Sequence, residues 1–187
     1  MRKFVICLSV FFAALLLSGC NHLTEYSISE QQVNKALQKH DNYQKDIGVN
    51  GLANAHIALS DLQASIGREE PNKVTLSGTA DIRLQSLFGS QHAVVNLKMK
   101  AQPVFDPQQS AIYLRDLQIT DIQVSPDKLH DVINAMMPLL NQSLKGYFEA
   151  NPAYVLSADH STGEALTNKL AKRLEVRPGE LVISLTN

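Results

Sequence analysis

The sequence predicts an α+β fold, in which a long, curved antiparallel β-sheet wraps around one long α-helix in the C-terminal half, with a short helix near the N-terminus. Between residues 51 and 124, apolar and polar residues alternate over long stretches, as in strands with one buried face. The alternation changes phase within some stretches, which predicts β-bulges and therefore a curved sheet. Over residues 125–149 the apolar period becomes 3.6, which indicates a helix.

The chain begins with a segment that has the layout of a secretory signal peptide. Arg2 and Lys3 precede an uncharged, mostly apolar run over residues 4–17. At ~1.5 Å per residue this run spans ~21 Å, which is short of the ~30 Å hydrocarbon core of a bilayer. The segment ends in Leu17-Ser18-Gly19-Cys20, which resembles the lipobox of bacterial lipoproteins.

The lipobox resemblance implies cleavage before Cys20 and attachment of diacylglyceryl and acyl groups to its thiol. Two or more such chains anchor a protein stably to a membrane. Lipoproteins held at the inner membrane typically carry Asp after the Cys, so Asn21 implies an outer-membrane anchor with the body facing the periplasm. The expected organisation is a cleaved signal peptide (1–19), a lipidated tether (20–28) and one α+β domain (29–187). The alternative is an ordinary signal in which Cys20 has no role.

The composition excludes two classes of partner. The chain has 17 Lys and Arg residues against 18 Asp and Glu residues, and Arg2 and Lys3 belong to the predicted signal. The remainder is therefore acidic, unlike a nucleic-acid-binding domain or a polybasic site for lipid headgroups. Because Cys7 also lies in the predicted signal, Cys20 is the one cysteine that remains in the predicted mature chain, and we expect a domain without disulfides.

The first predicted element is a short helix from Ser29 to about His40. Ser29 and Gln32 have the spacing of a capping box. Apolar residues lie on one face only, so we expect this helix on the surface; they are Val33, Ala36 and Leu37.

The middle of the chain predicts long strands. Two segments, 73–84 and 93–101, alternate without interruption and are joined by a hairpin at residues 87–90, with a further turn at 106–109. Their inward residues are Val74, Leu76, Gly78, Ala80, Ile82, Leu84, Ala93, Val95, Leu97, Met99 and Ala101. The flanking segments, 51–66 and 111–124, change phase, so that each contains either bulges or two or three shorter strands. We favour bulges, because a long curved sheet needs them.

Residues 125–149 predict a helix ~35 Å long at ~1.5 Å per residue. Ser125 is expected to cap it and Pro126 to occupy its first turn. Its apolar stripe contains Leu129, Val132, Ile133, Met136, Leu140, Leu144, Tyr147 and Phe148. We expect the face through Val132, Met136 and Leu140 to lie inside the sheet. A short strand (153–156), a small helix (164–170) and a hairpin (174–185) complete the chain.

No motif indicates catalysis. The six His residues lack the spacing of a metal pair. Asp159-His160-Ser161 contains the residue types of a triad, but sequence neighbours do not face one another as a triad requires. We therefore predict a protein that is not an enzyme, has no metal, and carries no cofactor beyond the groups on Cys20.

The long helix and long strands are matched in length, which allows two kinds of interior. The first is a solid core, with function on the surface as an interaction module for cell-envelope assembly or cell-wall enzymes. The second is an elongated apolar cavity that holds a lipid or acyl chain, helped by adaptable Met side chains. The residues predicted to line it are Val74, Leu76, Ile82, Val95, Leu97, Met99, Val132, Met136 and Leu140.

Several segments in order carry a family resemblance: the lipobox, Tyr26-Ser27-Ile28-Ser29, the helix start Ser125-Pro126, residues 151–156 (Asn-Pro-Ala-Tyr-Val-Leu) and residues 176–181 (Val-Arg-Pro-Gly-Glu-Leu). Together they resemble the YceB-type family of Gram-negative lipoproteins. That family is similar in fold to the TULIP group, the tubular lipid-binding domains of bactericidal permeability-increasing protein and its relatives. The resemblance implies a lipid channel between helix and sheet, but no particular binding residue.

Overall fold

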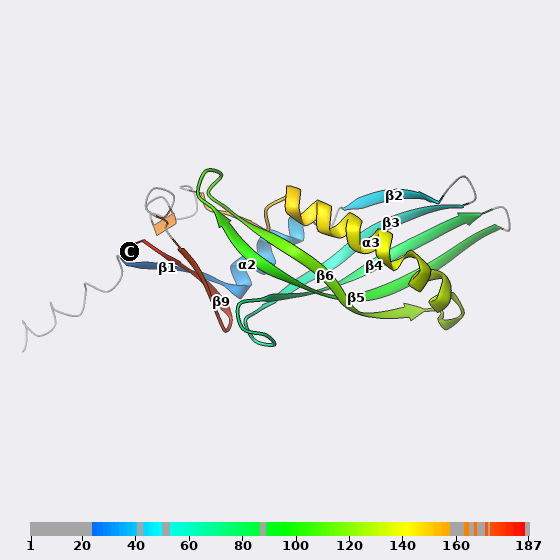
Figure 1. Cartoon of the computed structure of the whole chain (residues 1–187), viewed down its shortest axis with the longest axis horizontal. Coiled ribbons are helices and arrows are strands. Elements are labelled where there is room, and N and C mark those ends of the chain that lie inside the picture. The colour runs from blue at the N-terminus through cyan, green and yellow to red at the C-terminus, as the bar shows by residue number, and fades with distance from the viewer. Residues whose placement is uncertain are drawn as a thin grey trace, which may run out of the picture.

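The computed structural model describes residues 24–40, 43–49, 53–86, 89–157, 163–164, 167, 171 and 173–185. These residues form the predicted α+β fold, with a long curved sheet, a long helix along it and a smaller sheet at one end (Figure 1). The predicted signal peptide, Cys20 and Asn21 lie outside the described residues, as do most of the predicted small helix and residues 87–88 of the predicted hairpin.

The two sheets are antiparallel. The large sheet has the order β2-β3-β4-β5-β6-β7 and contains β2 (Gln44–Val49), β3 (Ala53–Ile66), β4 (Val74–Ser86), β5 (Gly89–Asp106), β6 (Ala111–Ser125) and β7 (Tyr154–Val155). The small sheet has the order β1-β9-β8 and contains β1 (Glu25–Ser29), β8 (Arg173–Arg177) and β9 (Glu180–Ser184). The helices are α2 (Glu30–Leu37), continued by the 3₁₀ turn η2 (Gln38–His40), and α3 (His130–Ala150), preceded by the 3₁₀ turn η3 (Asp127–Leu129).

The predicted capping box starts α2. The Ser29 Oγ accepts a hydrogen bond from the Gln32 amide at 3.3 Å, and the Gln32 Oε1 accepts one from the Ser29 amide at 2.8 Å. Val33 and Leu37 are buried, while the other α2 side chains are exposed or half-buried, so the prediction of a surface helix is confirmed.

The uninterrupted alternation of β4 and β5 is also confirmed. They pair continuously from Val74 opposite Ala101 to Ser86 opposite Gly89, and all their predicted inward residues are buried. The turn after β5 is fixed by Asp106, whose Oδ1 accepts hydrogen bonds from the amides of Gln108 and Gln109 at 2.8 and 3.2 Å.

Bulges account for the predicted phase changes. The register of β3 with β4 shifts between Ser60 and Gln63, and Asp61 there has φ of 55°. The register of β5 with β6 shifts twice, and Asp116 of β6 has φ of 51°. A left-handed residue lets the strand insert an extra position without ending, so β3 and β6 remain single long strands. The alternative of several shorter strands is thereby excluded.

Two sequence predictions about element boundaries are wrong. Residues 25–28, assigned to the tether, form most of β1, which pairs with β9 from Glu25 opposite Ser184 to Ser29 opposite Glu180. Tyr26 and Ile28 alternate with polar neighbours, and pairing with the end of the chain buries Ile28. Ser125 is the last residue of β6, and no side-chain hydrogen bond caps η3 or α3.

The inner face of α3 also differs from the prediction. Ile133, Leu140, Leu144 and Phe148 are buried, whereas Val132 is 45% exposed. Successive residues of a helix are ~100° apart around its axis. Ile133 lies near the middle of the buried face, so Val132 lies at its edge. The prediction that Val132 lies inside the sheet is therefore wrong, while Leu140 is correctly placed.

The edge of β3 beyond β2 is covered by side chains of α2. Asn34 receives a hydrogen bond from the Ala64 amide at 2.6 Å and donates one to the Ala64 carbonyl at 3.2 Å. Glu30 accepts hydrogen bonds from the Ile66 amide at 2.8 Å and from Arg68 Nε at 3.0 Å. Burial opposes ionisation of Glu30, but the hydrogen bonds from Arg68 and Ile66 hold the pKa of its carboxyl below the ordinary value. Its stabilising contribution is therefore lost as the pH falls through the acidic range.

Asn34→Ala is expected to lower the free energy of unfolding by ~1–3 kcal/mol, because it leaves both backbone groups of Ala64 without their partner. Lys35→Ala, at an exposed position of the same helix, is the control and should change stability by no more than ~0.5 kcal/mol. Urea denaturation followed by circular dichroism measures both. Equal stability of the two variants would contradict the assigned role of Asn34.

Candidate functional site

α3 lies along the large sheet between two of its strands, β6 and β2 (Figure 1). Toward β6 the helix is held by polar contacts. The Ile119 amide donates a hydrogen bond to Asn141 Oδ1 at 2.8 Å, Arg115 donates to the Glu149 carbonyl at 3.1 Å, and Lys145 Nζ lies 3.6 Å from Asp116 Oδ1. These contacts use residues of the β6 bulge region, so the bulge that curves the sheet also fixes one side of α3.

Toward β2, the helix is held by an aromatic contact near its C-terminal end. The ring centroids of Tyr43 and Tyr147 lie 4.4 Å apart. The Tyr43 hydroxyl lies 2.7 Å from Ser143 Oγ, and the Tyr147 hydroxyl lies 2.7 Å from His40 Nδ1. Burial raises the pKa of both tyrosines, so their hydroxyls are neutral hydrogen-bonding groups over the physiological pH range.

Beyond this contact, β2 and α3 border a groove of about 630 Å³. Its lining is mainly apolar and consists of Tyr43, Lys45, Asp46, Ile47 and Gly48 from the β2 side and Leu139, Gln142, Ser143, Gly146 and Tyr147 from α3. Leu139 is 40% exposed in it. A Cβ atom built on Gly146 would meet no atom within 4 Å, so the groove is open above this residue. We refer to these residues as the β2–α3 groove.

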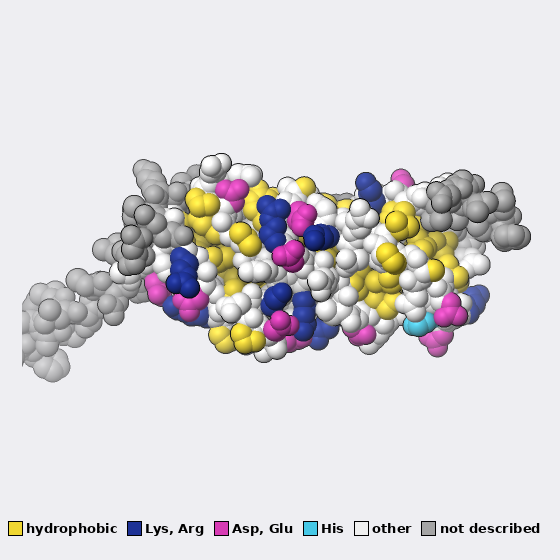
Figure 2. Space-filling view, in the orientation of Figure 1, with side chains coloured by type: hydrophobic (Ala, Val, Ile, Leu, Met, Phe, Trp, Pro, Cys, Tyr) yellow, Lys and Arg dark blue, Asp and Glu magenta, His cyan; other side chains and the backbone are white. Residues whose placement is uncertain are grey.

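Hydrophobic side chains also gather on the surface next to the Leu139 end of the groove. In Figure 2 one such area lies at the right, where Figure 1 places the N-terminal half of α3 and the neighbouring strands. Residues 132–144 of α3 contain no charged side chain, and Val132 and Leu139 are large exposed hydrophobic residues. The arrangement suits an apolar ligand with few directional contacts.

Apart from Val132, which is 45% exposed, the predicted cavity residues are brought together, but beneath the surface. All of those on β4 and β5 are at most 3% exposed, Leu140 is 2% exposed, and Met136 packs half-buried against the same hydrophobic cluster. That they line a ligand channel stays a prediction.

The β2–α3 groove contains none of these predicted residues. Its residues come from segments about 100 positions apart, which single-strand periodicity does not connect. The sequence feature that could have indicated the groove is the absence of charged residues from 132 to 144, which leaves the outer face of α3 uncharged there.

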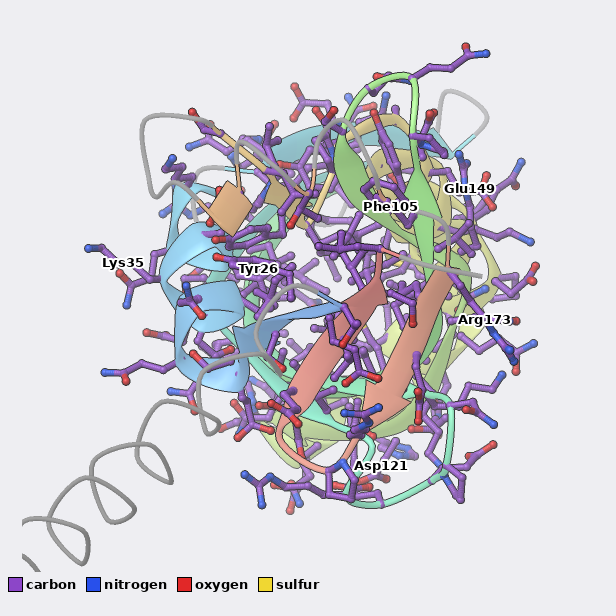
Figure 3. The ribbon with its side chains drawn as sticks, turned by 90° about the vertical axis from the view of Figure 1, so that its left-hand side faces the viewer. Tyr26, Lys35, Phe105, Asp121, Glu149 and Arg173 are labelled. Carbon is purple, nitrogen blue, oxygen red and sulfur yellow. The ribbon has the colours of Figure 1, made fainter. Side chains whose placement is uncertain are left out.

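A second polar cluster joins the small sheet to the end of the large one. The Glu164 side chain is 1% exposed and accepts hydrogen bonds from the hydroxyls of Tyr154 and Tyr26 at 2.7 and 3.1 Å and from the Ser157 amide at 2.7 Å. Burial raises the pKa of Tyr154, and the neighbouring carboxylate raises it further. Figure 3, which looks onto this end, places Tyr26 next to the interior while Lys35 points outward. The cluster fastens β1 and β7 to the helical residues 163–164.

Within the described ranges, no group of three potential metal ligands occurs and no helix is long and apolar enough to span a membrane. The triad-like residues Asp159-His160-Ser161 lie outside those ranges.

The chain is similar in sequence to known proteins over most or all of its length. Residues 28–180 match the family described as "Protein of unknown function (DUF1439)". The protein "Uncharacterized lipoprotein YceB" of Salmonella typhimurium is 54% identical, and its namesake of Escherichia coli K12 is 51% identical, each over 187 residues that cover 100% of both chains.

Among solved structures, the chain is similar to the crystal structure of lipopolysaccharide binding protein, at 11% identity and a TM-score of 0.37. The match covers 86% of this chain and 40% of that one, and a likeness at this level carries no argument about function. The full-length sequence matches settle the family: the chain belongs to the YceB lipoproteins, and hence to DUF1439.

Proposed function

We propose that this lipoprotein binds a lipid or acyl chain without converting it, and that the β2–α3 groove is where the chain enters. The observation that carries the proposal is the asymmetry of α3, which is fastened to β6 by hydrogen bonds and an ion pair but leaves a mainly apolar groove toward β2. Its volume of about 630 Å³ lies within the usual range for small-ligand sites.

The interior next to the groove suits a flexible apolar chain. Met136 and Met137 pack half-buried against the hydrophobic cluster on the inner side of α3, and Met side chains adapt to variable contents. An acyl chain that enters beside Leu139 would therefore extend toward the residues predicted to line the channel, such as Leu97 and Leu140. The proposal assigns no catalytic residue, metal or cofactor.

The proposed location is the periplasmic face of the outer membrane, through acyl and diacylglyceryl groups on Cys20. At no more than ~3.6 Å per residue, the chain between Cys20 and Thr24 spans ~14 Å. The small sheet would then lie next to the membrane. The N-terminal half of α3 lies toward the opposite end of the molecule (Figure 1), so the Leu139 end of the groove would be the end farther from the anchoring membrane.

A solid-core interaction module is the second candidate. It is favoured by the nearly complete burial of the β4 and β5 inner residues, which are at most 3% exposed at the predicted cavity positions. In that case the protein would act through surface contacts with envelope proteins and would take up no lipid. Ligand uptake therefore separates the two functions.

Gly146→Trp is expected to abolish binding of a fluorescent fatty acid while the melting temperature holds or rises. The indole would fill open groove space. A helical glycine costs ~0.5–1 kcal/mol relative to Ala, and Trp recovers part of that cost. Gly146→Ala is the matched control, because it also replaces the helical glycine but adds only a methyl group to the groove. Fluorescence titration of the three proteins measures uptake, and undiminished binding by Gly146→Trp would rule out the groove as the entrance.

A further inference from the structure

The free backbone edges of the large sheet differ in how they are covered. Along β3, Asn34 and Glu30 of α2 occupy the backbone groups of Ala64 and the Ile66 amide, and the Gly179 amide donates to the Ile66 carbonyl at 2.8 Å. Along β6, Asn141 of α3 accepts from the Ile119 amide. Side chains or turns thus replace a missing strand on both.

Among the described residues, none covers the outer edge of β2 in this way. The Leu59 amide donates to the Tyr43 carbonyl at 3.0 Å, and β2 continues in register with β3 from Gln44 opposite Ala58 to Val49 opposite Ala53. Because hydrogen-bonded and non-hydrogen-bonded pairs alternate in an antiparallel ladder, the backbone groups of Gln44, Asp46 and Gly48 point away from β3. Within the part of the chain that the structure describes, no partner reaches them.

β2 also lacks most features that protect an exposed edge. Proteins block edges with proline, bulges, covering elements or charges, and β2 has continuous register and no proline. Its charges are Lys45 and Asp46. Asp46 Oδ1 lies 2.8 Å from His56 Nδ1, whereas Lys45, at the groove, takes part in no ion pair among the described residues. With respect to the described residues, the edge therefore presents three open backbone positions, an apolar groove and one cation without an ion-pair partner.

We propose that β2 accepts an additional strand from a protein partner. The occupant is an extended peptide segment whose backbone pairs with Gln44, Asp46 and Gly48. Apolar side chains at alternate positions enter the β2–α3 groove, and an acidic residue pairs with Lys45. Main-chain pairing provides affinity and alternate side-chain pockets provide specificity in this mode of recognition. The inference does not rest on lipid binding.

Charge argues against a second copy of β2 as the occupant in the central register. Two β2 strands paired antiparallel about Asp46 would place the two Asp46 side chains directly opposite each other. Like charges in that position are destabilising. A segment with an acidic residue opposite Lys45 has no such penalty.

The decisive variant is Gly48→Pro in the full chain, purified in detergent. Proline removes the outward amide that the added strand would use, but no amide that pairs β2 with β3, and proline is tolerated at such edge positions. A Cβ atom at this glycine would meet only Asn54 Oδ1, at 3.5 Å. Gly48→Ala keeps the amide and is the matched control. Random seven-residue peptides displayed on phage serve as the probe and are selected on the unmodified chain.

We expect selected peptides to carry apolar residues at alternate positions and an acidic residue, and to slow amide hydrogen exchange at Gln44, Asp46 and Gly48. They should bind Gly48→Ala like the unmodified chain and Gly48→Pro at least tenfold more weakly. Lys45→Glu gives an independent readout should Gly48→Pro not fold: it should weaken the same peptides at least fivefold. Peptides that bind Gly48→Pro and Lys45→Glu as well as the unmodified chain would overturn the proposal, as would a selection that yields no binder.

Discussion

Ile133→Asp is expected to unfold the domain, whereas Val132→Asp, one residue earlier, is expected to leave it folded. Ile133 is 0% exposed and Val132 is 45% exposed. An unpaired carboxylate at the buried position costs several kcal/mol, a large part of a typical total stability of ~5–15 kcal/mol. At Val132 the carboxylate remains hydrated and lies in the first turn of α3, where negative charge is favourable.

Far-UV circular dichroism and urea denaturation of the two variants measure this difference. The pair is a close internal control, because the substituted residues are both β-branched, adjacent and on the same helix. A folded Ile133→Asp variant together with an unfolded Val132→Asp variant would mean that the opposite face of α3 packs on the sheet.

Cys20→Ala is expected to abolish lipid attachment completely, because only the thiol forms the thioether to the diacylglyceryl group. Metabolic labelling with radioactive palmitate should give a labelled band for the unmodified chain and none for the variant. Persistent labelling of Cys20→Ala would show that the lipid is carried elsewhere.

Asn21→Asp tests the proposed sorting separately, because it leaves the thiol in place. The variant should keep its palmitate label and move from outer-membrane to inner-membrane fractions of a density gradient. A labelled variant whose distribution does not change would contradict the role given to Asn21, without affecting that of Cys20.

The parts of the fold that local sequence determines were predicted. The capping box of Ser29 and Gln32 involves residues three apart, and the alternation of β4 and β5 reports only which side of a strand is buried. The bulges were also predicted, since a change of phase inside a strand has a direct geometric consequence at residues such as Asp61 and Asp116.

The parts that depend on distant contacts were not predicted. β1 looks like a polar tether until β9, more than 150 residues later, pairs with it. The helix stripe was broad enough to include both Val132 and Ile133, and only the position of the sheet decides which is buried.

The candidate site shows the same limit. Periodicity identified the inner residues of β4 and β5, because each strand carries that information alone. The β2–α3 groove depends on Tyr43 meeting Ser143 and Tyr147 across about 100 residues of chain. Hydrophobic periodicity does not identify Gly146, because this residue contributes to the groove by leaving space where a larger side chain would lie.

Native mass spectrometry tests the central claim most directly, because it detects any ligand that stays bound to the domain when it is purified from cells. Residues 21–187 are secreted behind an ordinary signal peptide, so that no covalent lipid is present, and are compared with the same chain carrying Gly146→Trp. Lipid binding through the β2–α3 groove predicts a bound mass in the acyl-chain or phospholipid range on the first protein and its loss from the second. A bare polypeptide mass for both, or the same bound lipid on both, would contradict it.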